Sequence, residues 1–272
     1  MRVLAVNDIS CVGRCSLASA LPIISACGVE CNVLPTALLS THTGGFEGYS
    51  FLDLTKEIRA ILAHWKKLGL KFDFIYSGYL GNIEQVELVM GLKEEFLATD
   101  GKFIVDPVMG DDGTLYNGFS QAFVEKMRKL CEQADYILPN ATEACFLSQL
   151  PYPLTEANTD EALHRLRALA PCPIITGVKG ETGISVHFID EQGKKRSFTH
   201  ENLEGFFCGA GDAFASAFVG CLANGTTETE AVRLADDFTA ACIRRSAKEV
   251  PDKRFGLNFE AEIFPFVKKL NA

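Results

Sequence analysis

Short apolar runs alternate with longer amphipathic segments along most of the chain. Runs rich in β-branched and aromatic residues predict strands, and they occupy residues 2–6, 31–34, 72–76, 102–105, 136–138 and 173–180. Apolar residues at helical spacing predict helices over residues 17–27, 53–68, 83–97, 121–131 and 161–170. Strands and helices alternate at least six times, which is typical of a doubly wound α/β fold with a mostly parallel central sheet flanked by helices.

The last part of the chain departs from this alternation. It predicts two antiparallel strands followed by three helices, at residues 183–189, 195–200, 213–223, 228–246 and 259–270. No repeat, low-complexity segment or linker interrupts the sequence, so we expect residues 1–272 to form a single domain. The polar loops at residues 7–14 and 36–49 are expected to build a small lid beyond the sheet.

Composition and charge narrow the classes of function. The 272 residues are 47% hydrophobic and 22% charged, as in soluble globular proteins. The net charge of −9, without a basic stripe, argues against nucleic acid as the main partner and against an anionic membrane surface. The start of the chain does not resemble a signal peptide, so we expect a cytoplasmic protein whose ten cysteines stay reduced. Cys208 is the cysteine that we expect to be reactive, because it adjoins a glycine-rich segment.

That segment, Gly209-Ala210-Gly211-Asp212, precedes an apolar run that predicts a buried helix. Unpaired N–H groups and the positive end of the helix dipole at such a start suit a phosphate. Asp212 would repel a bound phosphate, so its presence favours a base that takes a proton from a hydroxyl during phosphoryl transfer. The structural alternative is a tight loop with Asp212 as the helix N-cap. The segment is neither a dinucleotide fingerprint nor a Walker A loop.

Hydrogen-bonding side chains are concentrated in residues 40–43, with the sequence Ser-Thr-His-Thr, and the aromatic residues Phe46 and Tyr49 follow. A small polar aromatic ligand would use such a set, although a flexible surface loop has a similar composition. Both interpretations stay open.

Acidic residues and a lysine follow three of the later strands. A solvated turn accounts for Asp111 and Asp112, whereas Asp106, placed between Val105 and Pro107, favours cation- or phosphate-linked chemistry. Asn140 and Glu143, three residues apart at a predicted helix start, form either a capping box or a pair of oxygen ligands for Mg²⁺. Lys179 ends a predicted strand, where it could meet a phosphate as a point charge.

Six segments, taken in their order along the chain, resemble those of the ribokinase superfamily and, within it, the pyridoxal and pyridoxamine kinases. They span roughly residues 1–250 and comprise residues 40–44 (STHTG), 77–81 (SGYLG), 106–111 (DPVMGD), 139–143 (PNATE), 176–179 (TGVK) and 209–212 (GAGD). The first segment and the Gly-Tyr pair of the second favour the vitamin B6 branch.

The resemblance implies a ribokinase-like fold and ATP-dependent phosphorylation of the 5′-hydroxymethyl group of pyridoxal, pyridoxine or pyridoxamine. Asp212 corresponds to the base of such kinases, and the N–H groups of Gly209, Ala210 and Gly211 correspond to the anion hole. The residues that correspond to the pyridine pocket are His42, Thr43 and Tyr79.

Other correspondences concern the nucleotide. The resemblance places Asp106, Asn140 and Glu143 near the ATP phosphates, where Glu143 and Asp106 help to hold Mg²⁺. Thr176 and Lys179 correspond to residues near the nucleotide. A monovalent cation is a further candidate cofactor, and members of the family are typically cytosolic homodimers.

The first loop departs from the family pattern. A Ser-His-Val stretch usually follows the first strand and its serine touches the substrate, but Asp8 occupies that place here, with Ser10 two residues on. Both are candidates for the substrate contact. Because hydroxymethylpyrimidine kinases carry an acid in that loop, such a kinase is one alternative, and a non-catalytic vitamer-binding protein on the same fold is another.

Overall fold

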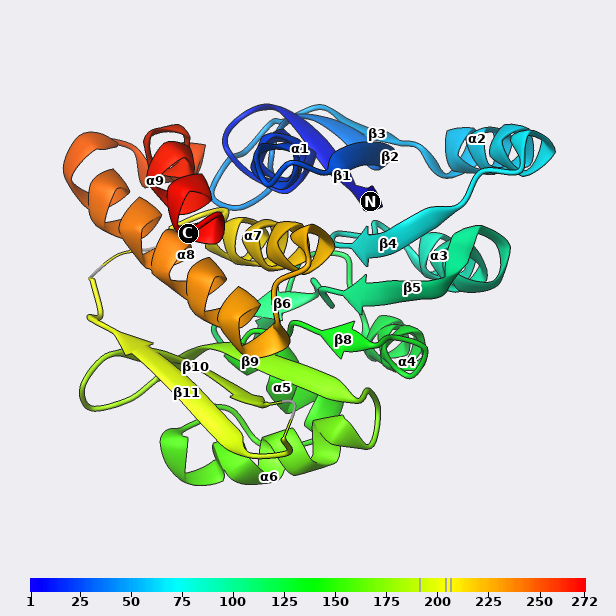
Figure 1. The fold of residues 1–272 in the computed structure, drawn as a ribbon. Helices are drawn as coiled ribbons and strands as arrows, with labels where there is room; N and C mark the ends of the chain where they lie inside the picture. The colour runs from blue at the N-terminus through cyan, green and yellow to red at the C-terminus, as the bar shows by residue number, and fades with distance from the viewer. Residues whose placement is uncertain (191, 204, 206) are drawn as a thin grey trace.

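The structure is a computed structural model that describes residues 1–190, 192–203, 205 and 207–272. Among them, a nine-stranded sheet has the order β11-β10-β9-β8-β5-β4-β1-β2-β3 (Figure 1). Its strands are β1 (Arg2–Val12), β2 (Glu30–Thr41), β3 (Phe51–Asp53), β4 (Phe72–Ser77), β5 (Leu97–Val105), β8 (Tyr136–Ile137), β9 (Cys172–Lys179), β10 (Ile184–Ile189) and β11 (Lys195–His200). The neighbouring strands β2, β1, β4, β5, β8 and β9 pair in parallel. At the two ends of the sheet, β3 pairs antiparallel with β2, and β10 pairs antiparallel with β9 and β11.

Helices cover both faces of this sheet (Figure 1). One face packs against α1 (Ser16–Ala26), α7 (Ala210–Asn224), α8 (Glu228–Glu249) and α9 (Glu260–Leu270). The other packs against α2 (Thr55–Leu68), α3 (Ile83–Phe96), α4 (Gln121–Cys131), α5 (Ala141–Ser148) and α6 (Glu156–Arg167).

The alternation of side chains along β1 explains the two layers. Val3 and Ala5 enter one core and Leu4 and Val6 the other, and all four are fully buried. A strand that is covered on both faces has a continuous apolar sequence, which is why residues 2–6 predict a parallel strand. The predicted doubly wound sheet flanked by helices is confirmed.

The two segments that we expected to form lid loops, residues 7–14 and 36–49, are in large part strand. β1 continues to Val12 and β2 to Thr41, and the two strands pair from Arg2 opposite Glu30 to Val12 opposite Thr41, with one register shift between Asn7 and Ile9. Much of residues 7–14 and 36–49 is therefore paired strand. The loop prediction for residues 7–14 was wrong because the polar residues Asn7, Asp8 and Ser10 indicated a loop. All three lie on β1 and are buried. Polar side chains at strand ends that face a cavity lose the usual apolar pattern of a strand.

Two smaller differences concern segments near the cavity. Residues 106–116 contain a short hairpin, β6 (Gly110–Asp111) and β7 (Thr114–Leu115), where we expected a turn. Helix α6 begins at Glu156 rather than at residue 161, because Thr155 and Asn158 form a capping box. Within the described ranges, no helix has the length and apolar character needed to cross a membrane.

Candidate active site

A cavity of about 1490 Å³ opens at the carboxyl ends of the parallel strands, where α/β proteins place their ligands. It gathers nearly all of the side chains and glycines that the sequence pointed to. These lining residues are Asp8, His42, Thr43, Tyr79, Asp106, Asn140, Glu143, Thr176, Lys179, Gly209, Ala210, Gly211 and Asp212. Ser10 is not among the residues that line it; its hydroxyl lies 3.3 Å from Oδ2 of Asp8. Of the two first-loop candidates, Asp8 is therefore the one that faces the cavity.

The glycine-rich segment starts α7 at the floor of the cavity. Gly209 has a left-handed backbone with φ of 80°, and a Cβ there would lie 2.3 Å from the Arg14 carbonyl oxygen. Only glycine fits this position. Gly209 is also the N-cap of α7, so Asp212 lies in the first turn. The alternative of Asp212 as the N-cap is thus wrong, which leaves its carboxylate available for chemistry.

Asp212 is half-buried and lies next to two hydrogen-bond donors, the Ser16 backbone and the Asn7 side chain. Burial raises the pKa of its carboxyl group, while a backbone hydrogen bond from Ser16 and the Asn7 amide lower it. Asn7 Nδ2 donates to Asp212 Oδ1 at 3.2 Å. Burial also raises the pKa of the neighbouring Asp8 to about 6, and the charge of Asp212 adds to this shift.

A second acidic corner lies where β5 and β8 end. The backbone N–H groups of Met109 and Asn140 donate to the two carboxylate oxygens of Glu143, at 3.0 and 2.9 Å. Asn140 Oδ1 in turn accepts from the Glu143 N–H, so the predicted capping box is present. Burial raises the pKa of Glu143 to about 8, and burial together with the charge of Glu143 raises the pKa of Asp106 well above its usual range.

Lys179 and Thr176 lie beside this corner on β9. The Thr176 N–H donates to the Pro139 carbonyl oxygen at 3.0 Å, which joins the end of β9 to the start of α5. Lys179 Nζ is 3.7 Å from Asp112 Oδ1, and both side chains are largely exposed. The lysine therefore stands at the mouth of the cavity.

His42 lines the cavity directly after the end of β2. Its Nε2 faces the carbonyl oxygen of Arg254, which can only accept, so Nε2 carries the proton. Nδ1 is then an acceptor, and it receives the Gly44 N–H at 3.1 Å. The thiol sulfur of Cys208 lies 3.6 Å from the same Nδ1. Burial and the charge of Asp212 raise the pKa of this thiol to about 12, which argues against the reactive cysteine that we expected.

A turn near the C-terminus holds the loop that follows His42. Arg254, in η1 (Lys253–Phe255), donates to the Gly45 carbonyl oxygen at 2.9 Å, and its guanidinium lies 4.8 Å from the centre of the Phe46 ring. The sequence contains no local signal for this contact, because more than two hundred residues separate the partners.

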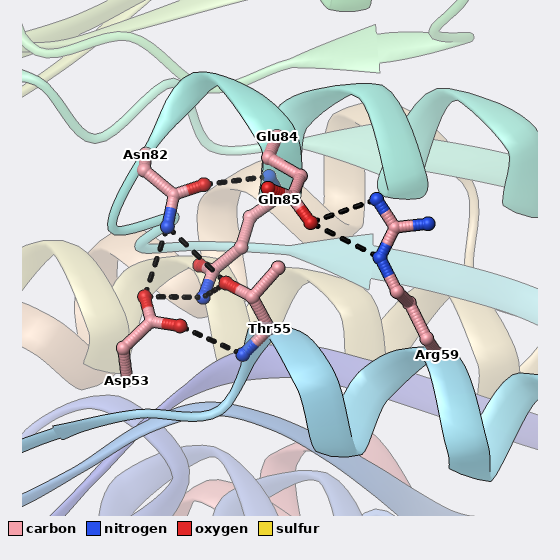
Figure 2. A network of polar contacts seen from close by, with 6 residues as sticks. All are labelled: Asp53, Thr55, Arg59, Asn82, Glu84 and Gln85. Carbon is pink, nitrogen blue, oxygen red and sulfur yellow. Dashed lines mark hydrogen bonds and ion pairs between the residues drawn. The ribbon is translucent and has the colours of Figure 1, made fainter.

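A polar network around the buried Gln85 fixes the loop that carries Tyr79, and Figure 2 shows the part of it that joins Gln85 to Asn82, Asp53 and Thr55. Gln85 is fully buried on α3; its Oε1 accepts from the Gly81 N–H at 2.8 Å, and its Nε2 donates to the Thr36 carbonyl oxygen at 2.9 Å. Thr36 Oγ1 reaches the Tyr79 carbonyl oxygen at 3.0 Å. Our sequence interpretation missed Gln85, since a glutamine in a helix usually signals solvent.

The wider network joins three elements. Asn82 caps α3 and donates to Asp53 Oδ2 at 2.9 Å, at the junction of β3 and α2. Thr55 accepts from Gln85 Nε2 at 3.0 Å (Figure 2). The Tyr79 loop, β2 and the start of α2 are thus bonded into one unit.

Comparison with known proteins agrees with this geometry. Residues 19–254 match the model of the phosphomethylpyrimidine kinase family. The chain belongs to this family. The structure of a pyridoxal kinase from Lactobacillus plantarum is similar to this chain, with 33% sequence identity and a TM-score of 0.91. The match covers 98% of this chain and 97% of the Lactobacillus plantarum chain.

Two further relatives of this family member extend the comparison. A Bacteroides thetaiotaomicron protein with the provisional name of phosphomethylpyrimidine kinase, solved with pyridoxal, is 37% identical, with a TM-score of 0.91 and coverage of 97% and 95%. Pyridoxal kinase PdxY of Haemophilus influenzae is 26% identical over 246 residues, which are 80% of this chain and 79% of PdxY. The predicted ribokinase-like fold and the predicted likeness to pyridoxal kinases are confirmed.

Proposed function

We propose that this kinase transfers a phosphoryl group from ATP to the 5′-hydroxymethyl group of pyridoxal, pyridoxine or pyridoxamine. The observation that carries the proposal is the half-buried Asp212 carboxylate, which lies in the first turn of α7 after Gly209 and lines the large cavity. Relatives named pyridoxal kinase, and one relative solved with pyridoxal, support the choice of substrate.

The transfer needs positioning and charge stabilisation more than covalent help from the protein. Asp212 accepts the proton of the vitamer hydroxyl while the hydroxyl oxygen forms a bond to the γ-phosphorus of ATP. The bond from that phosphorus to the bridging oxygen breaks, and ADP leaves with the electron pair. The N–H groups of Gly209 and Gly211 and the α7 dipole stabilise the phosphoryl oxygens, whereas the N–H of Ala210 lies 3.4 Å from the Phe207 carbonyl oxygen.

The corner of Asp106 and Glu143 fits Mg²⁺ carried by the ATP phosphates. Their pKa values are raised by burial, so a cation there would stabilise the charged forms. Both Glu143 oxygens already accept backbone N–H groups, which favours contact through water. When bound, Mg²⁺ would neutralise phosphate charge; Asn140, Thr176 and Lys179 would lie along the nucleotide.

The part of the cavity around His42 suits the pyridine ring of the vitamer. His42, Thr43 and Tyr79 would line it, and Asp8 would accept a hydrogen bond from a ring substituent. The neutral tautomer of His42, fixed by the Arg254 carbonyl, leaves the ring unable to donate through Nδ1.

A hydroxymethylpyrimidine kinase is the second candidate. The acid Asp8 in the first loop and the name of the matching family are compatible with it, but the relatives named pyridoxal kinase and the relative solved with pyridoxal favour a B6 vitamer. The chemistry would be unchanged, because this substrate also carries a hydroxymethyl group on a small aromatic ring.

ADP release with Mg-ATP tests these proposals. Pyridoxal, pyridoxine, pyridoxamine, hydroxymethylpyrimidine and ribose are assayed in parallel. We expect turnover on a B6 vitamer, and Asp212→Asn should lower kcat by about 10²–10⁴ with little change in nucleotide affinity. Asp100→Asn, on an exposed site, is the matched control. Turnover on hydroxymethylpyrimidine alone would identify the protein as a hydroxymethylpyrimidine kinase. Vitamer binding without turnover would favour a non-catalytic binding protein.

We further propose that residues 1–272 act as one cytoplasmic kinase domain that forms a homodimer. One continuous sheet links the first strand to the β10–β11 pair, which supports a single domain. The ten cysteines are free thiols, as a reducing compartment requires. An exposed apolar row on β1, β2 and β3 supports the dimer.

A further inference from the structure

Asn7 bonds both to the proposed base Asp212 and to the backbone of Tyr79, and it is fully buried. It follows the apolar part of β1, at a register shift in the pairing with β2. Its Oδ1 accepts two backbone N–H groups, those of Asp8 and Tyr79, each at 2.9 Å. Its Nδ2 donates to Asp212 Oδ1 at 3.2 Å.

These contacts fix which way the amide points. Asp8 N and Tyr79 N can only donate, so the atom that faces both must be the amide oxygen. The NH₂ group is therefore directed at Asp212 and cannot exchange places with the oxygen. One oxygen of the Asp212 carboxylate is held by a donor that has no alternative orientation.

The neighbouring backbone is shaped to admit this side chain. A Cβ on Gly78 would lie 2.3 Å from Asn7 Nδ2 and 2.7 Å from Asn7 Cγ. The Gly78 N–H meanwhile donates to the Val6 carbonyl oxygen at 2.8 Å, which holds the two strands together at this point. Glycine at position 78 is thus explained by the space that the Asn7 amide occupies.

We propose that Asn7 is a positioning residue for the phosphoryl transfer: its amide orients the Asp212 carboxylate, favours its ionised form and links it to the backbone of Tyr79. The inference rests on the proposed function of Asp212 as the base. The same amide bonds to the Tyr79 N–H, so base and vitamer pocket keep a fixed relation.

The titratable groups that influence Asp212 electrostatically come from six surrounding segments. They are Asp8 of β1, Cys15 before α1, His42 after β2, Tyr76 of β4, Asp106 after β5 and Cys208 before α7. Their presence means that only a comparison between variants isolates the contribution of Asn7.

The pH dependence of kcat/KM for the vitamer tests this role. Asn7→Asp preserves shape but places a carboxylate oxygen where the NH₂ group faced Asp212. A like charge at this distance should raise the pKa of the base, so the acid limb of the profile should move upward by about 1–3 pH units. Asn271→Asp, which makes the same change at an exposed side chain bonded to Val267, should leave the profile in place. A lower rate with an unmoved acid limb would overturn the proposal.

A double-mutant cycle provides a test that does not depend on Asn7→Asp folding. Asn7→Ala should lower kcat by about 10–10² in the wild-type background. In the Asp212→Asn background it should lower kcat less than about twofold, because the group that it positions is already gone. Equal losses in both backgrounds would show a merely structural role and contradict the proposal.

Titration of the Asp212 carboxyl carbon by NMR separates this inference from the proposed function. A higher pKa in Asn7→Ala than in the wild type supports the link between the two residues, even for a protein without turnover. An unchanged pKa of Asp212 would overturn the inference even for an active vitamer kinase.

Discussion

Glu143 is a buried side chain whose protonation should control stability at the scale of a single residue. Burial raises its pKa to about 8 from an ordinary value of 4.5. Between these values the folded protein holds a proton that the unfolded chain has lost. The free energy of unfolding must then fall as pH rises through this window, by at most about 1.4 kcal/mol per pH unit for one group.

Urea unfolding of the nucleotide-free protein from pH 5 to pH 8 tests this prediction. The unfolding free energy of wild type minus that of Glu143→Gln should fall as pH rises, since glutamine does not titrate. Glu125→Gln, at an exposed position of α4, should show no such trend. A constant difference between wild type and Glu143→Gln across this range would mean that Glu143 is ionised throughout.

At the scale of secondary-structure elements, the network around Gln85 joins the Tyr79 loop to β2 and to α2. Figure 2 shows the contact between Gln85 and Thr55 of α2. Gln85→Leu would remove the acceptor of the Gly81 N–H and one of the two donors to the Thr36 carbonyl oxygen, which keeps the Leu54 N–H at 3.1 Å. A polar group left without its partner costs about 1–3 kcal/mol. We expect the free energy of unfolding to fall by roughly 1–3 kcal/mol and the KM for the vitamer to rise more than the KM for ATP.

Arg59→Ala is the matched control within the same network. Arg59 and Glu84 form an ion pair at 2.7 Å, but both side chains are at least half exposed, so the loss should stay below about 1 kcal/mol. Chemical unfolding and steady-state kinetics of the two variants give both quantities. Similar effects of Gln85→Leu and Arg59→Ala would contradict a special role of the buried amide.

The same elements show what the sequence could predict. The sheet and its flanking helices follow from apolar periodicity, because Val3 to Val6 alternate between two cores. The cavity residues follow from polar segments at strand ends. Asn7, Gln85 and Arg254 could not be predicted, because their partners lie 205, 49 and 209 residues away. Their hydrogen bonds depend on tertiary packing, which leaves no local pattern.

At the scale of the whole molecule, the strand extension presents an apolar face. Ile9 pairs with Leu38, and Leu38 pairs with Leu52, so the three side chains form a row across β1, β2 and β3. Their exposed fractions are 37%, 39% and 56%. Three adjacent large apolar residues on a sheet near its edge invite association. The row lies on the strands that also carry Asp8 and lead to His42, so a partner there would adjoin the vitamer pocket.

Replacing Leu52 with aspartate should separate the proposed homodimer into monomers, because the charge would have to be buried without a partner. Sedimentation equilibrium of wild type at micromolar concentration should give twice the chain mass, and Leu52→Asp should give the chain mass. Phe264→Asp, at a side chain that is 78% exposed on α9, is the control for a charge placed on another apolar surface. A dimer that persists in Leu52→Asp but dissociates in Phe264→Asp would move the interface to α9. A wild-type protein of single-chain mass would refute the dimer altogether, and the apolar row would then need another explanation.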